Sequence, residues 1–372
     1  MKKKSTRALH EHKNKKQVSL PRWAKRVIFI SIIVAVLALI VGIILYAVVF
    51  GEDAENKRTV GTSGEYEIPY EQLRFVTMTY KAELDARYGD GNAANGTIWD
   101  DAATAEQYRA ELEELVWDTM RYNYSILQIC ANRNIGKEIF EGKEIATTVD
   151  EQIEALIAEY SSKKEYKADL EARYATEDLF RFYFALDEMK YLLHASMKKD
   201  GAFLSDEQEF EEWLTSANSA YVQHFLLYHE SDEEREDNYI ILENARQKLI
   251  SGELTLEQCI NLANDDLYNV APYYLMRNVH EDALVNAAVK LDVDEVSEII
   301  EVEGALYVIV RMEETPIEGA NGTTETPLSL QLTNLLSTYQ WAIVGDAVKV
   351  TQEALVIELN DYGKSIDLVT MK

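Results

Sequence analysis

The chain has 372 residues, with 65 acidic against 37 basic side chains and a formal net charge of −28. This acidity argues against a nucleic acid as partner, because nucleic-acid binding depends on Lys and Arg that neutralise phosphate. Only two cysteines occur, Cys130 and Cys259, which excludes a disulfide framework. Both stand among apolar residues at helical spacing, so buried thiols are expected, and a bridge between them is left open.

An apolar segment from Val27 to Phe50 contains no charged residue and no proline. Crossing a hydrocarbon core of about 30 Å takes about 20 helical residues. A cleaved signal peptide is the alternative, but its apolar region is usually about 7 to 15 residues long. We therefore expect an uncleaved transmembrane helix at residues 27–50.

Residues 1–26 carry ten Lys or Arg and one acid, a charge of +9, so the residues from 27 onward carry −37. Short segments rich in Lys and Arg stay on the cytoplasmic side of a membrane. The sequence therefore predicts a single-pass protein of the cell membrane. Its basic tail at 1–26 is expected in the cytoplasm, and the domains after the anchor are expected to be extracytoplasmic.

Residues 51–64 are polar and contain glycine, as expected for a flexible linker. From 65 to 217, apolar side chains recur at spacings of three and four residues, which indicates helices. No strand-like alternation appears before residue 220, so an all-helical domain is predicted at 65–217. Helix starts are expected at the capping pairs Thr104 with Gln107, Thr148 with Glu151 and Ser205 with Gln208, and at Thr176.

The pattern changes at Tyr221. The segment YVQHFLLY is apolar on both faces, as in a buried central strand. A strand, helices, a short strand, a helix and a hairpin follow in that order, which predicts an α+β domain at residues 218–315. Its later elements are expected to be a helix capped by Thr255 and Gln258, a strand at 273–276, a helix with Leu284, and a hairpin of 297–302 and 306–312.

Three stretches of this domain resemble the parvulin-type, PpiC-like peptidyl-prolyl isomerase domain. YVQHFLLY looks like the family's opening strand with its histidine, LTLEQCINLANDD like its helix and acidic loop, and LDVDEVSEII followed by GALYVIVRM like its closing segments. With the anchor and the helical domain, the whole chain resembles the membrane-anchored extracytoplasmic foldases of the PrsA and SurA type. The resemblance implies that residues 65–217 bind unfolded, newly exported polypeptides. The C-terminal segment, 316–372, is expected to pack back on them.

The resemblance also implies a catalytic cluster without metal or cofactor. Prolyl isomerisation must overcome a barrier of about 18 to 20 kcal/mol from lost amide conjugation, so a catalyst needs polar groups that favour the twisted amide. His224 matches the family's first histidine and Asp266 its Asp or Cys. Tyr307 stands where the family has its second histidine, and the threonine position falls near Glu301.

For the slot that holds the proline ring, Leu284 falls where the family has Phe, and Met276 or His280 where it has Met. Phe225, beside the first histidine, is also expected to contact substrate. The family's glycine-rich loop is replaced by the shorter NVAPYYL, and without the resemblance His224 would more often be a hydrogen-bonded core residue. These departures support an alternative, an inactive holdase whose degenerate parvulin domain binds clients or acts as a scaffold. A homo-oligomer is left open.

Overall fold

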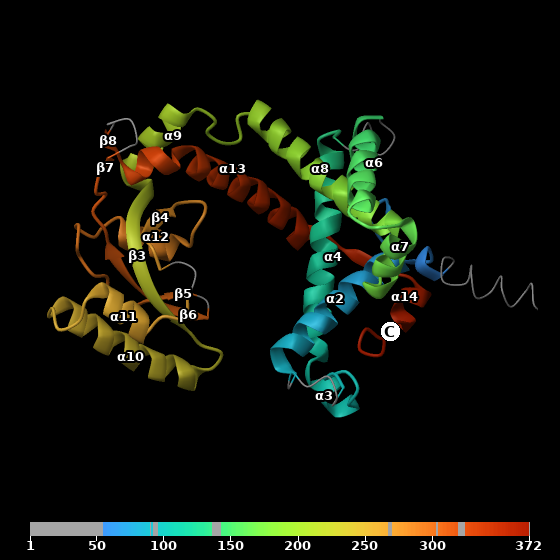
Figure 1. Cartoon of the computed structure of the whole chain (residues 1–372), viewed down its shortest axis with the longest axis horizontal. Coiled ribbons are helices and arrows are strands. Elements are labelled where there is room, and N and C mark those ends of the chain that lie inside the picture. Colours follow the sequence, from blue (N-terminus) through green and yellow to red (C-terminus); the bar gives the residue numbers. More distant parts are fainter. Residues whose placement is uncertain are drawn as a thin grey trace, which may run out of the picture. The chain divides into compact units, whose positions relative to one another are not determined.

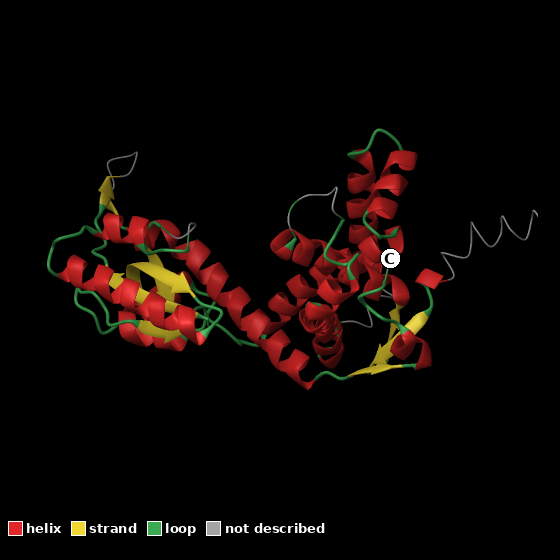
Figure 2. Cartoon of the chain, turned by 90° about the horizontal axis from the view of Figure 1, so that it is seen from below, coloured by secondary structure: helices red, strands yellow, loops and turns green. Residues whose placement is uncertain are grey.

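The computed structural model describes residues 55–89, 91, 96–135, 143–266, 270–302, 304–318 and 324–371. The predicted tail and transmembrane helix lie outside these residues, and none of the helices within them is long and apolar enough to cross a membrane. Figure 2 shows that the described chain is mostly helical, with strands confined to small sheets.

Helices dominate the part of the chain that was predicted to be all-helical. Their buried apolar faces meet in one core, in which Leu112, Val116 and Met120 lie in the same cluster as Leu186 and Met189. The helices are α2 (Tyr70–Tyr88), α3 (Ala102–Gln107), α4 (Arg109–Asn132), α6 (Lys143–Ala158), α7 (Lys163–Ala172), α8 (Glu177–Lys199) and α9 (Glu207–Trp213).

The helix caps follow the sequence prediction only in part. Thr176 caps α8 as expected, because its side chain accepts a hydrogen bond from a backbone N–H in the first turn. Two expected caps are wrong: Asp101 caps α3 in place of Thr104, and Asp206 caps α9 in place of Ser205. In both cases a carboxylate stands close by, and its charge also favours the positive helix N-terminus.

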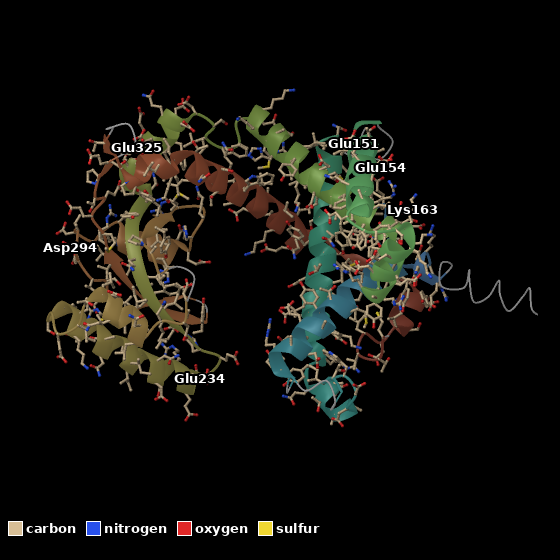
Figure 3. The ribbon with its side chains drawn as sticks, viewed as in Figure 1. Glu151, Glu154, Lys163, Glu234, Asp294 and Glu325 are labelled. Atoms are coloured by element: carbon tan, nitrogen blue, oxygen red, sulfur yellow. The ribbon has the colours of Figure 1, made fainter. Side chains whose placement is uncertain are left out.

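A third expected cap is wrong at α6, since this helix already begins at Lys143 and Thr148 lies inside it. Charged side chains of this helix and of the next one are exposed, among them Glu151, Glu154 and Lys163 (Figure 3). The opposite side of this helix is apolar and packs into the core, where Val149 and Ile153 are buried. The charged side chains Glu151 and Glu154 therefore lie on the solvated side of this helix.

A small sheet corrects two expectations, that residues 51–64 form a flexible linker and that the first domain is all-helical. Strand β1 (Thr59–Ser63) lies between β2 (Tyr66–Pro69) and β9 (Ile357–Leu359). Gly61 is required at this pairing, because a Cβ atom there would lie 2.5 Å from the carbonyl oxygen of Glu358. The pairing joins segments about 300 residues apart, and short strands of this kind leave no local periodicity in the sequence.

The segment after residue 316 contributes one long helix to the same core. Helix α13 (Pro327–Ala354) contacts α4, α8 and α9, and its buried side chains Leu336, Tyr339 and Val344 belong to the cluster that α4 and α8 form. A short β7 (Ile317–Glu318) pairs with β8 (Thr324–Glu325) before it, and α14 (Asp361–Ser365) follows it.

The α+β part is built on a four-stranded antiparallel sheet of order β4-β3-β6-β5 (Figure 1). Thr255 and Gln258 form the predicted capping box, whereas the strand expected at 297–302 is shorter. The elements are η2 (Leu214–Asn218), β3 (Ser219–Tyr228), α10 (Asp232–Ile250), α11 (Leu256–Leu262), β4 (Tyr273–Met276), α12 (Asp282–Ala288), β5 (Ile300–Val302) and β6 (Ala305–Arg311).

The two faces of this sheet are covered by different helices. On one face, Phe225 packs with Leu242 of α10 and Cys259 of α11. On the other face, Val222 packs with Leu284 of α12. Both cysteines of the chain are free and buried, and burial raises the pKa of the Cys130 thiol to about 12.

Candidate active site

His224 lies on β3, in the middle of the sheet, on the face that α12 covers. Successive side chains of a strand point to opposite faces, so His224 shares its face with Val222 and not with Phe225. Its side chain is almost fully buried, at 2% exposure. A buried polar side chain needs partners, because an unpaired one costs about 1–3 kcal/mol.

Two side chains from other elements reach the imidazole of His224. The hydroxyl oxygen of Tyr273 on β4 lies 2.9 Å from Nδ1, and Oδ2 of Asp266, which follows α11, lies 3.4 Å from Nε2. The antiparallel register places Tyr273 opposite Val222, two residues from His224. The chain thus brings together residues about 40 to 50 positions apart.

This arrangement sets the proton positions on the ring. Burial lowers the pKa of His224, with the opposing charge of Asp266 as a smaller effect, so the imidazole is neutral and carries one N–H. A carboxylate only accepts hydrogen bonds. Nε2 therefore bears the hydrogen, facing Asp266 across a distance that is long for a hydrogen bond, and Nδ1 accepts from the Tyr273 hydroxyl.

Tyr307 on β6 lies beside this pair. It stands opposite Leu226 in the strand register, and its ring centroid is 5.7 Å from that of His224. Burial is the main cause that raises the pKa of both Tyr273 and Tyr307, and the charge of Asp266 adds to it. Both half-buried hydroxyls consequently stay protonated at neutral pH and can donate hydrogen bonds.

His280 and Leu284 complete one side of the cluster. The ring of His280 lies 5.9 Å from that of Tyr273, and its Nδ1 accepts the backbone N–H of Met276 at 3.0 Å. Burial lowers the pKa of His280, so this ring is also neutral. Leu284 is buried and packs in the cluster that also includes Tyr307.

Three residues expected at the site lie elsewhere. Phe225 has no exposed surface and packs on the opposite face, among residues of α10 and α11. The side chain of Met276 is buried with the core of the helical part. Glu301, expected near the threonine position, forms a bidentate ion pair with Arg235 of α10 at 2.7 Å. The side chains of these three residues therefore pack away from the imidazole of His224, although the backbone N–H of Met276 binds His280.

Sequence reasoning overlooked Tyr273, which makes the shortest polar contact to His224. The sequence indicates this residue only as part of the strand at 273–276. Its strand register decides its role, and register depends on which strands pair, which a single sequence does not contain. One signal in the sequence could have indicated this contact: Tyr273 carries a hydroxyl group and lies on a strand that was expected in the same domain as His224.

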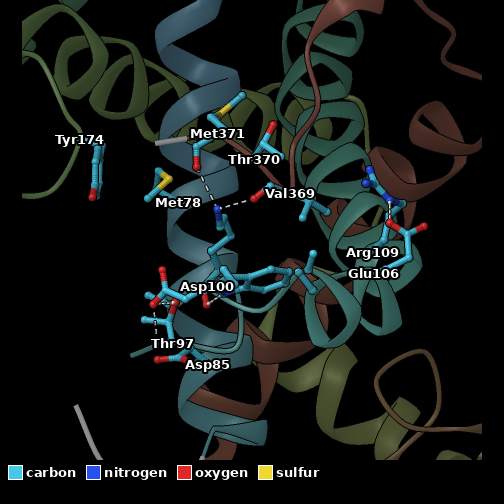
Figure 4. A pocket seen from close by; sticks show the side chains of 15 residues that line it. Met78, Asp85, Thr97, Asp100, Glu106, Arg109, Tyr174, Val369, Thr370 and Met371 are labelled. Carbon is cyan, nitrogen blue, oxygen red and sulfur yellow. Dashed lines mark hydrogen bonds and ion pairs between the residues drawn. The ribbon is translucent and has the colours of Figure 1, made fainter. Parts of the chain in front are cut away.

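A second candidate site is a cavity of about 800 Å³ in the helical part, lined by residues of α2, of α3 and of the segment 369–371 (Figure 4). The buried ammonium of Lys81 donates to the carbonyl oxygens of Val369 and Met371, each at 2.8 Å. It also lies 5.3 Å from the ring of Trp99. Met78 and Met371 supply a flexible apolar lining, suited to an apolar side chain of another polypeptide.

No metal-binding group of three or more His, Cys, Asp or Glu side chains occurs in the part of the chain that the structure describes. His224 with Asp266 is a pair, and His280 uses its Nδ1 for a backbone N–H. The chemistry open to the site is hydrogen bonding from the Tyr307 hydroxyl and from the imidazole of His280, next to an apolar wall.

No protein-family model and no curated protein matches this sequence. Among solved structures, the chain is similar to foldase protein PrsA from Streptococcus pneumoniae, at 17% identity over 70% of this chain and 96% of that one, with a TM-score of 0.32. It is also similar to a peptidylprolyl isomerase, PrsA, from Bacillus anthracis, at 14% identity over 58% and 91%, with a TM-score of 0.33.

A SurA-like chaperone from Campylobacter jejuni matches at 12% identity over 82% of this chain and all of that chain, with a TM-score of 0.24. The structural neighbours are thus PrsA and SurA-like proteins. Each of these TM-scores is below 0.5.

Proposed function

We propose that this protein is a membrane-anchored extracytoplasmic foldase, which binds unfolded exported polypeptides and catalyses cis-trans isomerisation of X-Pro bonds. One observation carries the isomerase activity: His224 lies between Asp266 and Tyr273, beside Tyr307 and the apolar Leu284. Neutral donors beside an apolar wall are what a twisting prolyl amide requires.

The reaction needs no covalent step. As the amide twists it loses conjugation, and its oxygen and nitrogen change their hydrogen-bonding character. Groups that bind the twisted amide better than the planar one lower the barrier. The hydroxyl of Tyr307 is the donor for the amide, because it is half-buried and remains protonated, whereas the single hydroxyl proton of Tyr273 is donated to Nδ1 of His224. His224 holds Tyr273 in place from below, and Leu284 offers an apolar surface to the proline ring.

Client binding is assigned to the helical part. The cavity beside Lys81 is lined by Met78, Trp99 and Met371, and Tyr191 on α8 leaves 62% of its surface exposed. Aromatic side chains such as those of Trp99 and Tyr191 bury a large area at low cost in conformational entropy, and methionine adapts its shape to irregular apolar surfaces. An unfolded segment would place one apolar side chain in the cavity.

The cavity can be tested by its effect on client aggregation. Met78→Glu places a charge in the cavity and should weaken the suppression of aggregation of an unfolded client several-fold. Thr79→Glu is the matched control, because Thr79 is the next residue of α2 and is exposed. Equal suppression by both variants would show that the cavity does not bind clients.

The membrane anchor in this proposal is supported by the apolar segment 27–50 and by the charge difference across it. Protease added to intact cells should remove the part after residue 50 and spare the basic tail. A chain that is fully protected until the cells are opened would contradict the orientation.

A second candidate function, a holdase without isomerase activity, is supported by the burial of His224. At 2% exposure the imidazole cannot itself reach a substrate amide without movement of its neighbours. In that case the His224 cluster would be a polar support of the fold, and client binding would be the whole function.

Exchange spectroscopy on a model Ala-Pro peptide separates the two functions. Uncatalysed exchange has a time constant of tens to hundreds of seconds. The full chain, purified in detergent, should shorten this time, and Asp266→Ala should lose most of the acceleration. No acceleration, in a preparation that still suppresses aggregation of an unfolded client, would refute the isomerase and leave the holdase.

A further inference from the structure

One edge of strand β3 is paired partly with a loop. β6 pairs with one edge of β3 along residues 222–228, whereas β4 pairs with the other edge only along 219–222. Beyond β4, the backbone N–H of Asp265 donates to the carbonyl oxygen of Leu226 at 2.8 Å. The backbone N–H of Tyr228 in turn donates to Oδ2 of Asp265 at 2.9 Å. The loop that follows α11 therefore satisfies backbone groups that a partner strand would otherwise bind.

Asn264 joins this loop to the strand through both polar atoms of its amide. Its Oδ1 accepts the backbone N–H of Leu226 at 3.0 Å, and its Nδ2 donates to the backbone carbonyl oxygen of Asp266. A backbone N–H only donates and a carbonyl only accepts, so these two partners fix the orientation of the amide. One side chain thus ties the backbone of Asp266 to that of Leu226, which is buried and stands two residues after His224.

The position of this loop decides what the imidazole of His224 faces. Oδ2 of Asp266 lies 3.4 Å from Nε2. Within the residues that the structure describes, no group forms a hydrogen bond of normal length with this buried nitrogen. The contact joins a loop to a strand, and a functional side chain keeps its geometry only when its surroundings hold it. The hydrogen bonds of Asn264 supply such a support for Asp266.

We propose that Asn264 is a positioning residue of the candidate active site: its amide holds the carboxylate of Asp266 against Nε2 of His224 and so keeps the hydrogen of the imidazole on that nitrogen. With the hydrogen on Nε2, Nδ1 accepts the hydroxyl proton of Tyr273. Loss of the carboxylate would also allow the other neutral tautomer, in which Nδ1 donates to Tyr273. The effect on catalysis, but not the effect on the tautomer, rests on the proposed isomerase function.

The test uses the full chain in detergent, with the nitrogen-15 shifts of His224 and Ala-Pro exchange as separate readouts. Asn264→Ala should populate both neutral tautomers and reduce the acceleration of exchange about tenfold, since a misplacement of about 1 Å can cost up to a hundredfold. Asn238→Ala is the matched control. The Nδ2 of Asn238 donates to the carbonyl oxygen of Tyr228 at 2.8 Å, so this variant also removes an asparagine contact with β3. It should leave the tautomer and the acceleration unchanged.

A second variant serves if Asn264→Ala does not fold. Asn264→Asp keeps the size of the side chain and an acceptor for the N–H of Leu226, but it turns an oxygen instead of an N–H toward the carbonyl of Asp266. It should mix the tautomers and reduce the acceleration in the same direction as Asn264→Ala.

The positioning role and the isomerase fail in different ways. A single, unchanged tautomer of His224 in the folded Asn264 variants would overturn the positioning role, and so would equal losses of acceleration in Asn264→Ala and Asn238→Ala. No acceleration by the unaltered chain would overturn the isomerase. The tautomer of His224 would in that case still decide whether Asn264 holds Asp266 in place.

Discussion

The two faces of strand β3 differ in what they bury. Phe225 enters an apolar core with α10 and α11 and has no exposed surface. One residue earlier, His224 enters the opposite core, in which Tyr273 and Tyr307 lie among apolar neighbours from α12. The same strand therefore supports a mainly apolar core on one side and a polar cluster on the other.

The difference shows what each face does for the protein. An apolar core contributes stability through buried area and close packing. A buried polar cluster contributes less to stability and only when its members are satisfied. We therefore expect changes on the two faces to affect different properties.

The largest expected effect is on stability and belongs to the apolar face. Phe225→Ala should lower the free energy of unfolding by about 3–5 kcal/mol, because it removes a buried aromatic ring and leaves a cavity. Urea unfolding followed by circular dichroism measures it. A loss below about 1 kcal/mol would show that the α10 and α11 face is not a tightly packed core.

The next effect is on catalysis and belongs to the polar face. His224→Ala should reduce the acceleration of Ala-Pro exchange about tenfold or more, since the support of Tyr273 is lost and Asp266 faces a void. The conservative Phe225→Leu is the control on the other face. If the two variants lost equal activity at equal stability, the polar face would have no special role.

A smaller effect is expected from the hydroxyl of Tyr273. Tyr273→Phe should cost about 1 kcal/mol of stability, the value of one hydrogen bond, and should allow His224 to populate both neutral tautomers. The nitrogen-15 shifts of His224 report the tautomer directly. Tyr274→Phe, the next residue on the other face of β4, should leave these shifts unchanged. A shift pattern unaffected by Tyr273→Phe would contradict the assigned hydrogen bond.

The smallest effect is that of pH. Burial lowers the pKa of His224 and of His280 below the unfolded value of about 6.5. Between the lowered folded pKa and about pH 6.5 the unfolded chain binds more protons, so stability should fall as pH falls through this window. The fall between pH 7.5 and 5.5 should be smaller in His224→Gln. An identical fall in both proteins would show that His224 does not titrate on unfolding.

The elements of the sheet domain could be predicted from sequence because their signals are local. Strand β3 forms at the apolar segment YVQHFLLY, and α11 begins at the capping box of Thr255 and Gln258, which are three residues apart. The pairing of β1 with β9 could not be predicted, because it depends on two short segments at distant positions. Caps were misplaced where an aspartate near the predicted residue competed, as at Asp101.

The candidate site could be predicted only in its chemistry. His224 and Asp266 do come together, at 3.4 Å. Whether the side chains of Phe225 and Met276 lie at the site depends on the face of the sheet to which they point. That face is decided by how the strands pair and which helices cover them. Tyr273 was overlooked because a tyrosine in an apolar run gives no sign of the histidine that its hydroxyl will meet across the register.

The most direct test of the polar face is Ala-Pro exchange measured side by side with the full chain, His224→Ala and Phe225→Leu, each at a temperature where it is folded. We expect the full chain and Phe225→Leu to accelerate exchange, and His224→Ala to accelerate it about tenfold less or not at all. Exchange at the uncatalysed rate in all three, or equal acceleration by His224→Ala, would contradict it.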